Sequence, residues 1–515
     1  METPIQQPIA TASLPAKPDI FAPANADEIK RKSVRGGAIS LVAQALRFVL
    51  RTGSVIVLAR LLSPEDFGLQ GMVAAVLGFL GIFRDAGLSV ATVQRNEITH
   101  QQISALFWTN VAVGAALTGI GVLATPGLVA FYKEPRLYWV SVVSVAAFLL
   151  NGLGIQHQAL LQRNMQYFTI AVIDLVALLV SLGVGIGMAL GGLGYWALVG
   201  MAVSAPFVST LGAWIAIPWM PGIPRRGSGI RSMLHFGGTC TLNSLVVYAA
   251  YNVEKVLLGR FWGAEALGLY GRAYQLVTLP IEQLNSSING VAFPALSRIQ
   301  HDPERLCRAF LKGYAILSSI SLPITLMCAV FAEEIVRVVL GQKWMEAAPI
   351  FRLLVPTAMT LALVNPFGWF MQATGRAVRS LCIALLIAPV VLLGILLGLH
   401  HGPKGVALGY SLAMASLVLP IITWAKRGTG ITMKSYWESI KPLVFSCLLA
   451  SIGGLLVKVL LIGKLATLPL LILETVTFGG VYAWFLLIVM RQKSLYLDLL
   501  AQVFPRLRRS ASSNL

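Results

Sequence analysis

Apolar segments of membrane-spanning length alternate with short polar segments along most of the chain. A helix needs about 20 predominantly apolar residues to cross the hydrocarbon core of a bilayer, and fourteen segments come close to this length. The pattern therefore predicts an all-α polytopic membrane protein with about 14 transmembrane helices. The expected spans are 36–61, 67–94, 101–126, 137–161, 167–190, 194–218, 233–261, 267–296, 304–330, 346–373, 377–400, 404–425, 441–462 and 466–490.

A helical hairpin near the start of the chain recurs two hundred residues later. Its first copy joins two apolar segments through a tight turn at Ser63 and Pro64. Six of fourteen positions are identical at one fixed offset, where ordinary composition predicts about one. The identical pairs are Leu58 and Leu258, Arg60 and Arg260, Glu65 and Glu265, Gly68 and Gly268, Leu69 and Leu269, and Gly71 and Gly271. The recurrence predicts a chain built from two copies of one helical bundle.

The two copies begin at the first and seventh expected spans. An even number of spans separates them, so both copies cross the membrane in the same direction, related by a pseudo-two-fold axis along the membrane normal. We expect two pseudo-symmetric six-helix lobes plus two extra C-terminal helices. The predicted organisation is a flexible cytoplasmic tail (1–35), an N-lobe (36–218), a cytoplasmic linker (219–232), a C-lobe (233–427), extra helices 13 and 14 (428–490) and a basic cytoplasmic tail (491–515).

Local signals mark several helix starts. Ser63 and Asp302 each precede a proline and at least one acidic residue, a pattern typical of an N-cap followed by a first helical turn. Thr99 stands three residues before Gln102, the spacing of a capping box. Apart from these helix starts, Gly183, Gly187 and Gly191 follow one another at four-residue spacing, which predicts a close helix–helix contact.

Composition excludes most soluble classes of protein. Hydrophobic residues make up 57% of the 515 positions and charged residues only 12%, whereas a soluble domain contains about 25% charged residues. The net charge of +19 would indicate nucleic-acid binding in a soluble protein, but here the basic residues lie in short loops between apolar spans. We therefore expect no nucleic-acid partner. The five cysteines lack metal-ligand spacing and are expected to be small buried side chains.

The distribution of basic residues predicts the orientation of the chain. Lysines and arginines gather in both terminal tails and in every second loop. The intervening loops contain only a few, such as Lys133, Arg136, Lys343, Lys404 and Lys464. Under the positive-inside rule both termini are cytoplasmic.

Signals for enzyme chemistry are missing. The chain contains no phosphate-binding loop of the G-x-x-x-x-G-K-[ST] type, no D-x-D pair and no loop long enough to hold a nucleotide-binding domain. We predict that the protein is not an enzyme and has no catalytic residue, metal site or cofactor. The function class that remains is transport across the membrane without a chemical reaction.

Two arginines lie deep in the first expected span. Arg47 and Arg51 are four residues apart and therefore share a helix face. Intramembrane charges usually face a bundle interior or a wet cavity. Two interpretations are open, a structural ion pair with a neighbouring helix or an anion site, and we favour the second because the arginines outnumber the nearby acids. Arg84 and Asp85, in the second span, suit a salt bridge or a substrate role equally well, and Asp174 is expected to be structural.

The second copy of the hairpin contains different charges. Glu282 lies deep in its span beside Pro280 and is the acid best placed for ion coupling, since a buried carboxylate can take up a proton or a cation. Glu254, Lys255 and Arg272 lie nearer the external end, where a mutual gate network is expected. The two copies would face each other across the centre of the molecule. We therefore predict a central cationic cavity, with Arg47, Arg51, Arg84 and Arg272 binding substrate and Asp85, Glu254, Lys255 and Glu282 serving ion coupling or gating.

Several motifs of the first two hundred residues resemble a known family. The chain looks like a Wzx-like polysaccharide or oligosaccharide-lipid flippase, in the polysaccharide transporter branch of the multidrug/oligosaccharidyl-lipid/polysaccharide exporter superfamily. The likeness covers about residues 36–430. The motifs are Ser63-Pro64-Glu65-Asp66-Phe67-Gly68-Leu69, Phe83-Arg84-Asp85-Ala86-Gly87-Leu88-Ser89, Ala105-Leu106-Phe107-Trp108 and Ala159-Leu160-Leu161-Gln162-Arg163.

This resemblance implies a function and a set of partners. A flippase of this kind moves oligosaccharide repeat units linked to undecaprenyl diphosphate across the bacterial inner membrane, for exopolysaccharide, capsule or O-antigen biosynthesis. Its two lobes open alternately to either side, and the pyrophosphate suits a cationic cavity. The lipid bilayer, a polysaccharide polymerase, a chain-length regulator protein, and a proton or sodium as coupling ion are the expected partners.

Two other functions remain open. A drug or cation antiporter of the same superfamily would favour acids in a mostly apolar cavity, which the arginines argue against. A non-transporting membrane component of the polysaccharide assembly machinery would need none of the cavity charges. An integral glycosyltransferase or polymerase is disfavoured because the loops and acidic motifs that it would need are missing.

Overall fold

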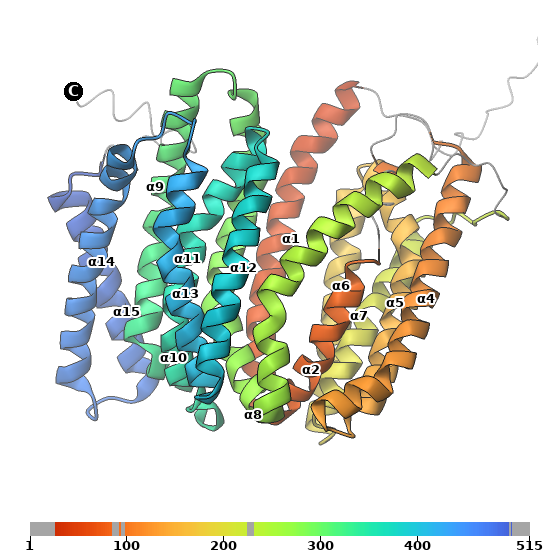
Figure 1. Cartoon of the computed structure of the whole chain (residues 1–515), viewed down its shortest axis with the longest axis horizontal. Coiled ribbons are helices and arrows are strands. Elements are labelled where there is room, and N and C mark those ends of the chain that lie inside the picture. Colours follow the sequence, from red (N-terminus) through yellow and green to blue (C-terminus); the bar gives the residue numbers. More distant parts are fainter. Residues whose placement is uncertain (1–25, 85–91, 94–97, 224–230, 494–495, 497–515) are drawn as a thin grey trace, which may run out of the picture.

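The protein is a bundle of long helices (Figure 1). The computed structural model describes residues 26–84, 92–93, 98–223, 231–493 and 496, and these residues form no β-strand. Eleven of the described helices are long and apolar enough to cross a membrane. Together with α2 and the two arms of α8, the described chain has fourteen long helices, so the predicted all-α membrane fold is confirmed.

The helices form two lobes and an appended pair. The N-lobe contains α1 (Ala26–Leu61), α2 (Pro64–Gly81), α4 (His100–Tyr132), α5 (Leu137–Arg163), α6 (Tyr167–Leu190) and α7 (Trp196–Ala216). The C-lobe contains α8 (Arg231–Arg298), α9 (Pro303–Val330), α10 (Ala332–Val339), the 3₁₀ turn η1 (Gln342–Trp344), α11 (Ala347–Ala373), α12 (Ala377–Leu399) and α13 (Gly402–Ala425). The appended pair is α14 (Met433–Leu461) and α15 (Thr467–Trp484), which continues as the π-helical η2 (Phe485–Val489).

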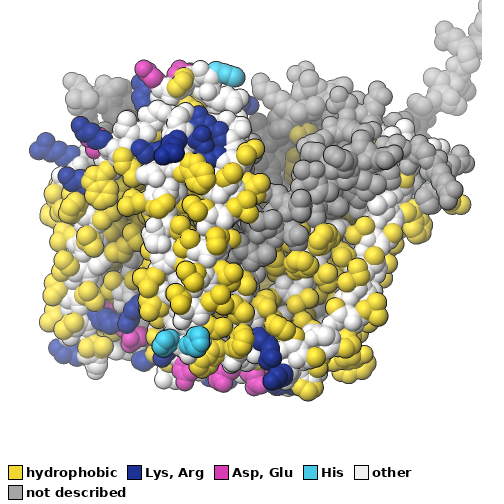
Figure 2. All heavy atoms as spheres, in the orientation of Figure 1, with side chains coloured by type: hydrophobic (Ala, Val, Ile, Leu, Met, Phe, Trp, Pro, Cys, Tyr) yellow, Lys and Arg dark blue, Asp and Glu magenta, His cyan; other side chains and the backbone are white. Residues whose placement is uncertain are grey.

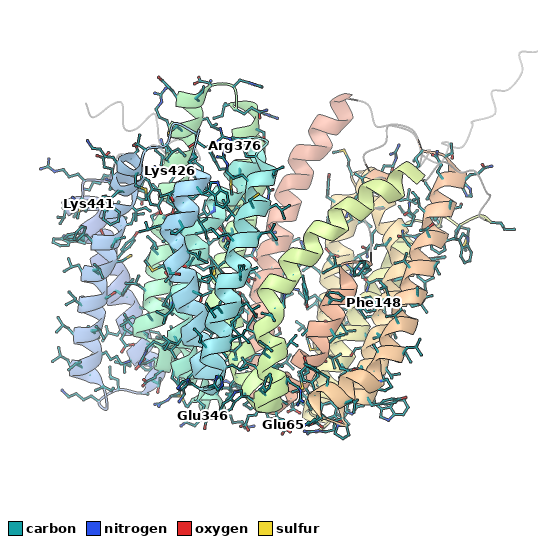
Figure 3. The ribbon with its side chains drawn as sticks, in the orientation of Figure 1. Glu65, Phe148, Glu346, Arg376, Lys426 and Lys441 are labelled. Carbon is teal, nitrogen blue, oxygen red and sulfur yellow. The ribbon has the colours of Figure 1, made fainter. Side chains whose placement is uncertain are left out.

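The surface separates apolar from charged side chains in a way that suits a membrane. Figure 2 shows a broad hydrophobic band across the middle of one face, with charged side chains gathered along its upper and lower edges. Glu65 and Glu346 lie at the lower end, and Arg376, Lys426 and Lys441 lie at the upper end (Figure 3). The described start of α1 and the end of η2 both lie at the upper end (Figure 1).

The predicted helix starts are confirmed. Ser63 and Asp66 form a reciprocal capping box at the start of α2, and Thr99 and Gln102 form another at the start of α4. Asp302 accepts a hydrogen bond from the backbone N–H of Arg305 and so caps α9. These starts could be predicted because a capping side chain satisfies N–H groups only three residues away.

The second copy of the hairpin differs from the first in its turn. Two separate spans were expected at 233–261 and 267–296, but α8 runs through both, with a break only at Gly263 (φ 80°, ψ −174°). Gly263 occupies the position equivalent to Ser63. Glycine adopts a positive φ without steric penalty, so the chain reverses there without a connecting loop.

The two copies touch through glycines at a crossing of α2 and α8. A Cβ atom added to Gly68 would lie 1.7 Å from the carbonyl oxygen of Ala264, and one added to Gly268 would lie 1.8 Å from that of Pro64. Pro64 and Ala264 are equivalent residues of the repeat, so the contact is reciprocal. This reciprocity is what a pseudo-two-fold axis between the copies requires, and the recurring glycines allow the backbones to approach closely.

Some local expectations are wrong. The second helix was expected to reach residue 94, but it ends at Gly81; residues 85–91 and 94–97 lie outside the described residues. The short helix α10 was not predicted, and α14 begins at Met433, eight residues before the expected start, where Thr432 caps it. Among the described residues, no atom outside their own helix lies within 4 Å of the added Cβ of Gly183 or Gly187, so the close contact predicted from their spacing is not formed there.

The crossing predicts opposite effects of alanine at two neighbouring glycines. Gly268→Ala must push α2 and α8 apart and should destabilise the fold by about 1–3 kcal/mol. Gly271→Ala is the matched control, because its Cβ would meet no described atom within 4 Å and alanine favours a helix interior by about 0.5–1 kcal/mol over glycine. Thermal unfolding of the purified protein in detergent measures both, and equal melting temperatures would contradict the crossing.

Candidate functional site between the lobes

The lobes are held together at the lower end of the bundle. The indole N–H of Trp344, in η1 of the C-lobe, donates a hydrogen bond of 2.8 Å to the carbonyl oxygen of Ala59 in α1. The ring of Trp344 also packs against Phe67 of α2, with 5.4 Å between ring centroids. Arg60 donates to the carbonyl oxygen of Val338 at 2.7 Å. Three contacts from two elements of each lobe therefore close this end.

Arg272 belongs to the same junction. Its guanidinium lies 3.8 Å from the centroid of the Phe67 ring and donates a hydrogen bond to Gln275. A cation over an aromatic face gains electrostatic stabilisation from the ring quadrupole. Arg272 therefore joins α8 to α2, next to the glycine crossing, in the conformation described.

Acidic and basic side chains also meet in the turn between α4 and α5. Arg136 bonds Glu65 of α2 at 2.6 Å and Glu134 at 2.8 Å. The hydrogen bond from Arg136 lowers the pKa of Glu134 below its usual value. All three side chains remain partly exposed, so this network positions the turn and contributes little stability.

Arg47 has an acidic partner. Its guanidinium forms a 2.6 Å ion pair with Asp174 of α6, and each side chain is about one-third exposed, 35% and 36%. Of the two interpretations of Arg47, a structural ion pair or an anion site, the structure shows the ion pair. Asp174 is its partner and so has the structural role that was expected. The positive charge of Arg47 is therefore offset within the N-lobe.

Other predicted site residues lie in open positions. Arg51, one turn after Arg47, is exposed, and so are Arg84 and Glu282. No ion pair joins any of these three to another described residue. Asp85 lies outside the described residues. Arg51 thus adds to the face that it shares with Arg47 a positive charge that no described acidic residue pairs with.

The expected network of Glu254, Lys255 and Arg272 is not formed as ion pairs. Lys255 instead donates to Asn252 at 2.8 Å and lies over the ring of Tyr274. Glu254 is 1% exposed, and neither of its carboxylate oxygens has a hydrogen-bond partner in the described part of the chain. Its electrostatic neighbours are Lys255 and the hydroxyls of two tyrosines, Tyr248 and Tyr270.

Tyr248 connects this polar group to the other lobe. Its hydroxyl donates a 2.9 Å hydrogen bond to the carbonyl oxygen of Ala75 in α2, and it fills the space beside Gly78. Glu254 therefore interacts electrostatically with Tyr248, the α8 residue that contacts the other lobe directly. A buried carboxylate in this place can respond to a change in that contact, because its charged form is costly without a partner.

A buried charge cluster that the sequence did not predict joins the appended pair to α10. Lys458 of α14 contacts both carboxylate oxygens of Glu334 in α10, at 2.9 and 3.0 Å. Glu474 of α15 is fully buried, has no hydrogen-bond partner among the described residues, and interacts electrostatically with both. Glu334 falls in an expected loop and Lys458 near the end of an expected span, whereas Glu474 lies inside the last expected span, where an acidic residue was the one signal in the sequence. Only the meeting of three helices reveals the cluster.

Other contacts also attach the appended pair to the C-lobe. The hydroxyls of Tyr314 in α9 and Tyr436 in α14 are 3.1 Å apart, and Tyr482 of α15 donates to the carbonyl oxygen of Ser319 at 2.8 Å. Gly454 of α14 lies against the ring of Phe331. The pair is therefore packed on α9 and α10 as a fixed part of the lobe.

The buried cluster predicts a large cost for losing its one cation. Lys458→Met leaves two buried carboxylates without a counter-charge and should destabilise the protein by about 3–5 kcal/mol. Arg352→Met is the matched control, because Arg352 pairs with Glu333 across 3.2 Å at an exposed site and such pairs contribute about 0–1 kcal/mol. Melting temperatures of the two variants should differ clearly, and similar losses would show that the Lys458 cluster is not effectively buried.

Comparisons with known proteins identify the family. The sequence profile of the family described as polysaccharide biosynthesis protein matches residues 57–349, more than half of the chain. Teichuronic acid biosynthesis protein TuaB of Bacillus subtilis (strain 168) is 29% identical over 304 residues, covering 58% of this chain and 62% of TuaB. The match thus spans a little under two thirds of that relative.

A second relative and a solved structure cover more of the chain. Lipopolysaccharide biosynthesis protein WzxC of Escherichia coli (strain K12) is 27% identical over 424 residues, covering 81% of this chain and 83% of WzxC. The fold is similar to that of lipid II flippase MurJ in an inward closed conformation, with a TM-score of 0.71 and 12% identity over 89% of this chain and 99% of MurJ. The protein is thus a multi-pass membrane protein that belongs to the polysaccharide biosynthesis protein family, the Wzx-like branch of its superfamily.

Proposed function

We propose that this protein is a flippase that moves polyprenyl-diphosphate-linked oligosaccharide repeat units across the bacterial inner membrane, for exopolysaccharide, capsule or O-antigen biosynthesis. The observation that carries the proposal is the pair of pseudo-symmetric lobes that meet through the reciprocal Gly68 and Gly268 contact. Two bundles that meet at one end can separate there and close at the other end, which exposes a central site to each side in turn. Membership of the family and the fold shared with a lipid II flippase support the same conclusion.

The proposal assigns the two ends of the bundle to the two sides of the membrane. We assign the end that holds Arg376, Lys426 and Lys441 (Figure 3) to the cytoplasm, because the positive-inside rule favours basic residues on that side, and we assign both termini to the same side. The end closed by Phe67 and Trp344 then faces outward. The conformation described here is closed to the outside, and alternating access requires those contacts to break.

The cavity charges act on the diphosphate in this proposal. Arg51 and Arg84, which have no ion-pair partner among the described residues, attract the anionic group, and Arg272 joins them when its contact with Phe67 opens. Arg47, paired with Asp174, orients the face of α1. Coupling to a proton or sodium at Asp85, Glu254, Lys255 or Glu282 stays a prediction.

Transport of this kind needs neither a catalytic residue nor a cofactor, because no covalent bond changes. The product appears at the outer leaflet as an intact lipid-linked repeat unit. A polysaccharide polymerase and a chain-length regulator protein are therefore the proposed partners that take it over.

Deleting the gene tests the direction of transport. We expect lipid-linked repeat units to accumulate in the cytoplasmic leaflet, where a membrane-impermeant lectin or oxidant added outside cannot reach them. Accumulation in the outer leaflet would contradict the flippase and would point to a later step of polysaccharide assembly.

Charge reversal tests the cationic cavity. Arg51→Glu should lower the rate of transport by at least about tenfold, because one charge pair in a partly hydrated site contributes about 1–4 kcal/mol. Arg51→Lys should retain much of the activity. The control is Arg308→Glu, which reverses an exposed arginine near the start of α9. Transport by Arg51→Glu at the wild-type rate would remove Arg51 from the site without affecting the deletion test.

A further inference from the structure

The surface of the C-lobe contains a groove where α12 and α13 cross. The two helices touch through backbone, because Gly398 and Gly405 each leave only 2.1 Å between an added Cβ and the carbonyl oxygen of the other. Gly394 and Gly409 form a second such pair, at 2.5 and 2.0 Å. Without side chains to fill the crossing, a groove of about 650 Å³ lies beside it.

The walls of this groove, which we call the α12–α13 groove, are apolar over most of its length. Leu393, Leu397, Leu408 and Leu412 line it and are 46–68% exposed. From Lys404 to Ser416 the groove follows thirteen residues of α13, a length of about 18 Å at 1.5 Å per residue. This is about half of a ~30 Å hydrocarbon core, so the groove spans one leaflet.

One end of the groove is basic. His401 and Lys404 belong to its lining, both are exposed, and no ion pair with another described residue neutralises Lys404. The first turn of α13, which begins at Gly402, adds the backbone N–H groups of Gly402 and Lys404, which lack partners within the helix and attract anions. Positive charge therefore meets the apolar wall at the level of the lipid headgroups.

The basic end is also held in place. The indole N–H of Trp262 donates a 2.8 Å hydrogen bond to the carbonyl oxygen of Leu399. Gly402, with φ +68°, lies against the Trp262 ring, where an added Cβ would be 3.3 Å from three ring atoms. A fixed backbone lets the charges act on a ligand without first being ordered.

We propose that the α12–α13 groove binds one anionic glycerophospholipid, with an acyl chain along the glycine pairs and the phosphate at His401, Lys404 and the start of α13. The length of the groove matches one acyl chain in one leaflet, and its charge is complementary to a phosphodiester. The occupant fills the space that the glycines leave and so keeps α12 and α13 together when the lobes move. This inference concerns a groove on the surface of the C-lobe and does not depend on which substrate the protein transports.

Native mass spectrometry of the full-length protein in detergent tests the proposal. We expect one dioleoyl phosphatidylglycerol to stay bound under conditions that remove dioleoyl phosphatidylcholine, which has the same acyl chains and no net charge. Lys404→Glu should weaken phosphatidylglycerol binding on the order of tenfold. Leu397→Trp, which places a ring over the groove at an exposed position, should weaken the binding of both lipids.

The matched control is Lys464→Glu, in the turn between α14 and α15. Lys464 is exposed, lies on the same predicted side of the membrane and does not line the groove, so its reversal should leave lipid binding unchanged. Equal losses in Lys404→Glu and Lys464→Glu, or equal retention of the two lipids by the wild type, would overturn the proposal. Displacement of phosphatidylglycerol by stoichiometric undecaprenyl diphosphate would also overturn it, because the groove would then serve the carrier lipid.

Discussion

The backbone contact between α2 and α8 is the constraint on which the rest of the molecule depends. In a bilayer, lipid tails are as apolar as leucine side chains, so helices associate through close packing and hydrogen bonds and not through the hydrophobic effect. Gly68 and Gly268 provide that packing at the place where the two copies of the repeat meet. The contacts of Ala59, Phe67, Arg272 and Trp344 surround it and make one end of the molecule a joint between two lobes.

The two copies share this joint, but their charged side chains have different kinds of partner. In the first copy, Arg47 is neutralised by an acid from the same lobe. In the second copy, Lys255 and Arg272 use amide and aromatic partners, and Glu254 is left without a hydrogen-bond partner among the described residues. The two copies of the repeat thus share a scaffold and differ in how their charges are paired.

Close helix contacts recur where the chain has to be rigid. The glycine pairs of α12 and α13 repeat, inside the C-lobe, the kind of contact that joins the lobes. The appended α14 and α15 are attached by tyrosine hydrogen bonds and by the buried cluster around Lys458. Motion between the lobes would then move α8–α15 as one body, with the junction near Gly68 and Trp344 as the part that has to change.

The sequence by itself determined the membrane class, the positions of most helices, the repeat and the caps at Ser63, Thr99 and Asp302, because hydropathy and capping depend on residues close together in the chain. It also provided all the candidate charges of the site. Only the tertiary structure decided that Arg47 pairs with Asp174, that Gly263 replaces a loop, that Gly68 and not Gly183 makes a backbone contact, and that Glu334, Lys458 and Glu474 meet. Partners in these contacts come from different helices, and the spacing of residues within one helix does not say which face meets which neighbour.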